Sequence, residues 1–389
     1  MKKQLSVILL ALCGITAQAQ KLDYNIDFQY IFNNHEFDAS SEKFDPSFTL
    51  NAARLTPSFG CRIEQNRHIH HRVMVGLDLY KNMGEGVRAD DLRREMTIYY
   101  DIDAWFRKKC NFGAIAGMYP RAFMEGDYVG PFFDDCLLFT DCNMEGMAFK
   151  YRNERIYAEI GLDWMGMLGD IEHPLRRERF QVLSSGDWNF ASNVSLGWRG
   201  SFYHFACSPQ SPNVIDNHML HPYLKWSPDT WLDELSVCAG VVASYQRDRR
   251  ASSEPTILCG ALVSQKLSKW KVGIDNTFYF GPDLMPLYDN SYGGVKYGSD
   301  LYFGEECYHT QADGDSWCDI LKLYYKPKLS KFVSISVATI FHIGQPSDLP
   351  AMRGSQQVVS LHLNLDALRP QPRPYEKIKL PGIFSGSIL

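Results

Sequence analysis

The chain has 389 residues, a formal net charge of −5 and an isoelectric point near 6.1. This weakly acidic balance excludes the basic footprint of a nucleic-acid-binding protein, so no nucleic-acid partner is expected. Aromatic residues make up 13% of the chain and charged residues 22%, which suits a membrane barrel with two aromatic girdles better than a soluble enzyme.

Residues 1–19 have the pattern of a secretory signal peptide. Two lysines precede an apolar run from about Leu5 to Ile15, and Ala17-Gln18-Ala19 forms an A-x-A cleavage site. This run is too short to cross a bilayer, and no later run reaches about 18 apolar residues, so transmembrane helices are not expected. We therefore predict an exported protein whose mature chain begins at Gln20.

Beyond the signal peptide, apolar and polar residues alternate in sixteen segments. A period of two is the signal of a β-strand with two different faces. One hairpin shows it clearly, because Ile156, Ile160 and Trp164 face one side while Tyr157 and Glu159 face the other. The predicted strands lie near residues 23–37, 47–64, 69–81, 93–107, 111–122, 142–152, 155–166, 178–188, 194–206, 218–227, 234–246, 255–267, 270–281, 318–327, 332–343 and 356–367.

The two faces of these strands differ in charge. The apolar faces, such as Val73, Val75 and Leu77, are nearly free of charge, whereas the polar faces mix charged residues with Gly and Ser. A charge at the bilayer midplane costs about 2–4 kcal/mol, so an uncharged face suits lipid and a polar face suits a lumen. A sheet in lipid cannot leave its edges unpaired. We therefore predict an all-β fold, a transmembrane antiparallel β-barrel of about 16 strands (14–18) over residues 20–368.

The connections between the predicted strands alternate between short and long. Asn153-Glu154 is one of the short ones, and 282–317 is the longest. This sorting is typical of a barrel with tight periplasmic turns and large external loops, whereas a soluble sandwich has no reason for it. After the last strand, proline occupies every second place in 369–374, which forbids a strand ladder. Residues 369–389 are therefore predicted to form a periplasmic tail.

This architecture resembles the outer-membrane β-barrels of Gram-negative bacteria, and among them the porin-like proteins. The Ala-Gln-Ala-Gln end of the signal and the stretch 280–309 look like those of Bacteroidetes barrels. The resemblance implies a bacterial outer-membrane location, contact with outer-membrane lipid, and small polar solutes as the molecules that pass. A monomer and a homo-trimer both remain open. The chain differs from general porins in continuing past its last strand to Leu389.

The acidic loop 125–141 is the third long loop, which in general porins folds into the lumen and forms the constriction. Its carboxylates would face arginines on the polar faces of the second and third predicted strands, and opposed charges would set up a transverse field. The alternative is a solvated loop that covers the barrel mouth. The candidate constriction residues are Arg54, Arg62, Arg72, Asp127, Asp134 and Asp135.

Nine cysteines remain after cleavage, and an odd number argues against a complete disulfide framework. Cys136 and Cys142 share one loop and are a candidate disulfide, and Cys307 and Cys318 could close another ring. No C-x-x-C pair occurs, so a structural zinc site is not expected. We predict neither a metal nor a cofactor.

The leading functional prediction is a passive pore for small polar solutes. The alternative is a non-transport barrel that acts in surface binding or envelope assembly through the 282–317 loop and the tail. The sequence has no G-x-S-x-G motif and no recognisable lipase pattern, and Ser and His in separate strands occur by chance. We therefore predict that the chain is not an enzyme.

Overall fold

The computed structural model describes most of the chain beyond the predicted signal peptide. The described ranges are 20–37, 47–84, 92–106, 109–167, 178–206, 213–251, 254–292, 294–310, 314–344 and 351–365. Both the signal peptide at 1–19 and the tail at 369–389 lie outside the described residues. Among the helices in these ranges, none is long and apolar enough to cross a membrane.

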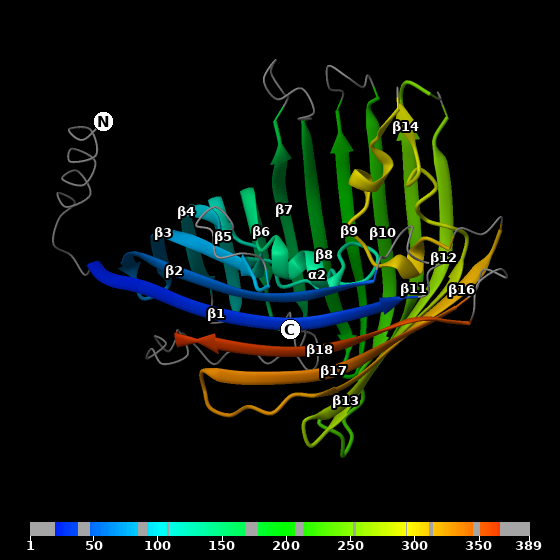
Figure 1. The fold of residues 1–389 in the computed structure, drawn as a ribbon. Coiled ribbons are helices and arrows are strands. Elements are labelled where there is room, and N and C mark those ends of the chain that lie inside the picture. The colour runs from blue at the N-terminus through cyan, green and yellow to red at the C-terminus, as the bar shows by residue number, and fades with distance from the viewer. Residues whose placement is uncertain are drawn as a thin grey trace.

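In the described ranges, sixteen antiparallel strands close into one barrel (Figure 1). β1 pairs with β2 on one side and with β18 on the other, so the ring has no open edge. This confirms the predicted fold class. The barrel strands are β1 (Gln20–Phe37), β2 (Phe48–Asn66), β3 (Ile69–Asn82), β4 (Arg93–Phe106), β5 (Cys110–Pro120), β6 (Asn143–Arg152), β7 (Ile156–Gly166), β8 (Arg179–Ala191), β9 (Val194–Phe205), β10 (Ile215–Trp226), β11 (Glu234–Asp248), β12 (Thr256–Lys269), β13 (Val272–Gly281), β16 (Ser316–Tyr325), β17 (Val333–Gly344) and β18 (Met352–Asn364).

The alternation of side chains decides which face of each strand meets lipid. In β7, Ile160 is 49% exposed on the outside, whereas the side chains of Tyr157 and Glu159 are buried inside. β3 repeats the pattern, with Val75 and Leu77 outside. Closure of the sheet lets the strands pair their backbone hydrogen bonds with one another. The apolar exterior matches the hydrocarbon core of a bilayer.

Two loops fold into the lumen. The first, residues 121–142 between β5 and β6, contains η2 (Arg121–Phe123) and α2 (Asp135–Thr140), and Figure 1 shows α2 within the ring of strands. The second, which we call the 282–310 loop, is described over 282–292 and 294–310 and follows β13. It contains β14 (Ser291–Tyr292), β15 (Val295–Lys296), η3 (Gly298–Leu301) and η4 (Glu306–Tyr308).

The two inner loops pack against each other. The amide of Asp134 donates to the carbonyl of Phe303 at 2.7 Å, and the amide of Glu305 donates to the carbonyl of Gly130 at 2.9 Å. Their aromatic side chains form one cluster with the inward residues of the wall, including Tyr203 of β9. Part of the lumen that the polar strand faces surround is therefore filled by packed side chains.

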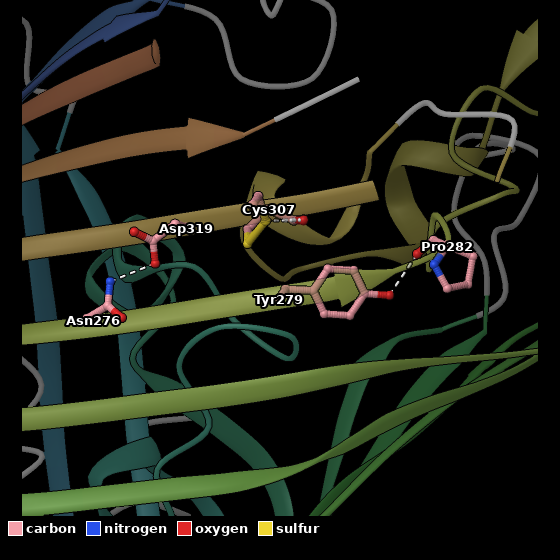
Figure 2. The surroundings of a disulfide bond; sticks show 6 residues. Asn276, Tyr279, Pro282, Cys307 and Asp319 are labelled. Atoms are coloured by element: carbon pink, nitrogen blue, oxygen red, sulfur yellow. Dashed lines mark hydrogen bonds between the residues drawn. A yellow bond between two sulfur atoms is a disulfide. The ribbon is translucent and has the colours of Figure 1, made fainter. Parts of the chain in front are cut away.

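A disulfide fastens the end of the 282–310 loop to the wall. It joins Cys307 of η4 to Cys318 of β16, as the sequence spacing allowed (Figure 2). Beside it, the hydroxyl of Tyr279 donates to the carbonyl of Pro282 at 2.7 Å. These contacts fix both the start and the end of the loop to neighbouring strands.

Candidate functional site

The 121–142 loop crosses the lumen and is held by ion pairs at both ends of its path. Glu125 pairs with Lys150 at 2.7 Å and also with Arg152, both on β6. Asp135 pairs with Lys322 of β16 at 3.2 Å. β6 and β16 stand eight positions apart in the closed ring of sixteen strands, so these two anchors lie on opposite walls.

A third anchor lies between the other two. Asp127 contacts Lys266 of β12 at 3.3 Å and Arg199 of β9 at 3.6 Å. Because the carboxylate of Asp127 pairs with two cations from different strands, the loop backbone is held in position at this point and the negative charge is balanced. The three acidic anchors of the loop thus meet cations from four strands.

These cations keep the loop carboxylates ionised. Lys322 holds the pKa of Asp135 below its usual value. Burial alone would raise the pKa of Asp127, but Lys266 and Arg199 outweigh it and hold that pKa below its usual range. The pKa of Glu125 is also lowered, again because neighbouring cations outweigh burial. All three anchors are therefore charged at neutral pH.

A buried carboxylate of the wall binds the backbone of the same loop. Glu159 of β7 accepts hydrogen bonds from the amides of Glu125 and Gly126, each at 2.7 Å, and from the hydroxyl of Tyr128 at 2.9 Å. Three donors from one stretch of the loop thus converge on a single carboxylate. Glu159 is therefore a structural anchor for the point where the loop turns into the lumen.

The predicted arginines occupy different places. Arg54 is buried, pairs with Asp78 of β3 and donates to the carbonyl of Phe139, so it contacts the inner loop. Arg72 instead pairs with Asp101 of the neighbouring strand at 2.9 Å.

Of the other predicted residues, Arg62 lies away from the inner loop and Asp134 lies within it. Arg62 lies 3.9 Å from Asp23 of β1, away from the loop acids. Asp134 caps α2 by accepting from the amide of Leu137 at 2.6 Å. Of the six predicted residues, Asp127 and Asp135 face wall cations directly, and Arg54 meets the loop through its backbone.

The cations that meet the loop acids are residues that the sequence analysis did not select for the constriction. Their positions on the polar faces of predicted strands were a usable signal, since each alternates with outward apolar residues. These cations are Lys150, Arg152, Arg199, Lys266 and Lys322.

The candidate disulfide between Cys136 and Cys142 does not form. Cys136 lies within α2, with its sulfur 3.3 Å from Nε2 of His35. Cys142 lies beyond the helix, with its sulfur 3.3 Å from a carboxylate oxygen of Asp78. The short helix separates the two thiols and turns them toward different strands.

A cavity of about 820 Å³ remains beside the inner loops. Its lining comes from the two inner loops and from strands around much of the ring, among them β4, β9, β12 and β13 as well as β1, β2, β16, β17 and β18. It begins at Lys326 and Asn364, at the short-turn end of the barrel, and reaches Phe48 and His342 at the long-loop end. The cavity therefore extends within the lumen between its two ends.

The lining of this cavity carries eight acidic and five basic side chains. The acidic residues outnumber the basic ones even where ion pairs join them, so the local field favours cations. The acidic residues are Asp27, Glu125, Asp127, Asp134, Asp135, Glu234, Asp275 and Glu305, and the basic residues are Arg121, Arg199, Lys266, Lys322 and Lys326.

A closed sixteen-stranded barrel with an apolar exterior and a polar interior crossed by an inner loop defines a class of protein. The chain is a Gram-negative outer-membrane β-barrel with a porin-like fold, and its location is the bacterial outer membrane. This confirms the predicted class and location.

Solved outer-membrane proteins share the fold at very low sequence identity. OmpT, an outer membrane protein of Vibrio cholerae, is 9% identical, with 90% of this chain and 99% of that chain covered and a TM-score of 0.50. A trimer form of the same protein is 8% identical, with 89% of this chain and 100% of that chain covered and a TM-score of 0.50. The anion-selective porin from Comamonas acidovorans is 10% identical, with 89% of this chain and 99% of that chain covered and a TM-score of 0.50.

A protein-family model, described as Lipid A 3'-O-deacylase-type, matches residues 15–206. The described part of this segment runs from β1 to β9 and includes the 121–142 loop. The match overturns the prediction that the chain is not an enzyme, because the matched family is named for an enzymatic activity. A missing G-x-S-x-G motif does not exclude an enzyme of this kind, and Ser and His in separate strands cannot be dismissed as chance, because a barrel can assemble a site from separate strands. No curated protein is similar enough in sequence to match.

Proposed function

We propose that this barrel is an outer-membrane channel for small polar solutes. The observation that supports it best is the cavity within the lumen, which has lining residues at both ends of the barrel. Its volume of about 820 Å³ is in the range of sites for single small molecules. The channel is therefore narrow, and its solutes are small.

The cavity lining sets the expected selectivity. Because acidic side chains exceed basic ones, the channel favours cations and polar neutral solutes over anions. The field across the inner loop arises between Asp127 or Asp135 and the lysines that face them.

Single-channel recording in a planar bilayer tests this function. Folded protein should produce discrete conductance steps, and a salt gradient should give a reversal potential of the sign expected for a cation-preferring pore. A barrel that inserts without conducting would contradict the channel and favour the non-transport alternative in surface binding or envelope assembly.

A second candidate function is hydrolysis of lipid acyl esters, which the family match over residues 15–206 favours. Incubation of the folded protein with lipid A, followed by mass spectrometry of the lipid, would detect the loss of one ester-linked acyl chain. An unchanged lipid mass would contradict this candidate. The channel and the hydrolase do not exclude each other.

A homo-trimer is the candidate assembly, supported by the trimer form of the Vibrio cholerae barrel. Light scattering of the detergent-solubilised protein would give its mass. A mass of one chain after subtraction of detergent would contradict the trimer.

A further inference from the structure

We propose that Cys136 and His35 form a thiol–imidazole catalytic pair that cleaves carboxylic esters within the lumen. This activity goes beyond the channel function and does not depend on conduction. It agrees in reaction class with the second candidate function, and it assigns the chemistry to named residues.

The two reactive groups are within direct reach of each other. The sulfur of Cys136 lies 3.3 Å from Nε2 of His35, although the two residues are 101 positions apart in the chain. A thiol beside an imidazole is the arrangement that activates a cysteine nucleophile, because the imidazole takes the thiol proton. His35 is itself held in place, since its ring stacks on Phe48 with 4.2 Å between ring centres.

A buried amide completes the arrangement. Asn33 shares the inner face of β1 with His35, two residues away, and its side-chain amide lies 3.5 Å from the sulfur of Cys136. The same amide lies 3.4 Å from the side-chain oxygen of Gln356, the residue directly opposite His35 on β18. Gln356 in turn contacts His342 at 2.9 Å. This network from β1, β17 and β18 positions Asn33 against the thiol.

The pair is open to a ligand. Cys136, His35, Gln356 and His342 all contribute to the lining of the 820 Å³ cavity. Asn33 is 1% exposed, and its side-chain oxygen has no hydrogen-bond partner among the described residues. A buried polar atom without a partner is costly. The cavity gives a ligand access to the thiol and the imidazole.

The neighbouring thiol shows why this pair is distinctive. Cys142 lies in the same loop but faces the carboxylate of Asp78 at 3.3 Å and no histidine. Burial raises the pKa of the Cys142 thiol well above its usual value, and Asp78 raises it further. Cys142 is therefore a matched control for Cys136.

The reaction balances with water as the only co-reactant. His35 takes the thiol proton while the sulfur of Cys136 bonds to the ester carbonyl carbon, and the amide of Asn33 donates to the developing oxyanion. The intermediate collapses by breaking the carbon–oxygen ester bond, and the departing alkoxide takes the proton from His35. Water then attacks the thioester with His35 as base, which releases a carboxylic acid and restores the thiol.

The ester can come from a solute in the lumen or from a lipid acyl chain, and two probes separate these sources. Folded full-length protein in detergent is mixed with p-nitrophenyl acetate or with micellar p-nitrophenyl palmitate. Release of p-nitrophenol is followed with time, and the acylated peptide is located by mass spectrometry. Turnover of the acetate alone assigns a solute ester, and turnover of the palmitate assigns a lipid ester.

Three variants decide the outcome. Cys136→Ala should abolish both the product burst and the acyl adduct, and His35→Gln should slow acylation about 100-fold or more, as loss of a general base does. Cys142→Ala should leave both unchanged. Each variant is first checked for a heat-modifiable barrel on a detergent gel. Turnover of neither ester, an adduct on another cysteine, or equal acylation in His35→Gln would overturn the proposal, whatever the conductance measurement shows.

Discussion

Lys322 of β16 lies 3.2 Å from the carboxylate of Asp135 at the start of α2. This contact ties the inner helix to the wall opposite the strand that holds Glu125. Both side chains are partly exposed to the lumen, so the pair contributes about 1 kcal/mol, as partly solvated ion pairs do. Its importance is geometric, because it keeps the loop stretched across the lumen.

The first prediction concerns this pair. Asp135→Asn should loosen α2 and increase the noise of the open-channel current. The free energy of unfolding of the barrel should change by about 1 kcal/mol or less. Lys322→Met should have the same effect, and the double variant should be no worse than either single variant. Lys21→Met, which removes an exposed ion pair with Glu64, is the control. Additive effects of the two substitutions would show that the residues act independently.

The second prediction concerns selectivity. Asp127→Asn should shift the reversal potential in a salt gradient toward anions, and Lys266→Met should shift it toward cations, because both side chains line the cavity. Recording at about 0.1 M salt keeps the Debye length near 10 Å, so the charges are not masked.

Arg62→Gln is the matched control for these two variants, because Arg62 pairs with Asp23 and does not line the cavity. It should leave the reversal potential unchanged. If Arg62→Gln shifts the potential as much as Lys266→Met, the current does not pass along the cavity described above.

The barrel could be predicted from the sequence because its determinant is local. In β7, the alternation of Tyr157 and Glu159 with Ile160 fixes which side of the strand faces lipid, whatever the rest of the chain does. The strand boundaries follow from the same period. Closure follows from the chemistry of lipid, which admits no unpaired edge.

The site could not be predicted to the same extent because its determinants are distant. Asp127 and Lys266 are 139 positions apart and meet only because the loop crosses the lumen. α2 has six residues, too few for a helical period to show in the sequence. Without that helix, Cys136 and Cys142 look like neighbours in one loop, and the contact of Cys136 with His35 is invisible.

The third prediction concerns acid. The pKa values of Glu125, Asp127 and Asp135 are lowered in the folded protein. Each carboxylate therefore stabilises the folded state fully at a pH above the ordinary carboxyl pKa, which is about 4. That contribution is lost as the pH falls below about 4 and passes through the lowered values. The docked loop should therefore be stable at pH 7 and become mobile in strong acid.

Conductance measured from pH 7 down to pH 3 checks this. The wild-type channel should show a change that begins below about pH 4. A triple variant, Glu125→Gln with Asp127→Asn and Asp135→Asn, should lack this step because its loop has no carboxylates to protonate at these positions. A step of equal size in the triple variant would assign the acid response to other groups.

The fourth prediction concerns the disulfide between Cys307 and Cys318. The bond closes a short ring, and on a chain-entropy estimate it stabilises the folded loop by roughly 3 kcal/mol. Reduction, or the variant Cys307→Ser with Cys318→Ser, should release η4 and increase amide hydrogen exchange across the 282–310 loop. Exchange in the 121–142 loop should rise less, since its ion pairs remain. Unchanged exchange near η4 after reduction would show that packing alone holds the loop.

The last prediction concerns Glu159, whose carboxylate accepts three hydrogen bonds from the 121–142 loop. Glu159→Ala leaves the amides of Glu125 and Gly126 and the hydroxyl of Tyr128 without this acceptor, at a cost of about 1–3 kcal/mol for each donor that stays buried. The barrel should lose its heat-modifiable form at a lower temperature, and the loop should become accessible to protease.

Glu159→Gln separates hydrogen bonding from charge. Its single side-chain oxygen can still accept from the loop, so its effect should lie between those of the wild type and Glu159→Ala. Glu64→Gln removes a carboxylate from an ion pair with Lys21 and should leave loop and barrel unchanged. If Glu159→Ala loosens the barrel without exposing the loop, Glu159 stabilises the wall rather than the docked loop. The loop would then depend on its ion pairs alone, and the Asp135 and Asp127 variants should expose it to protease more than Glu159→Ala does.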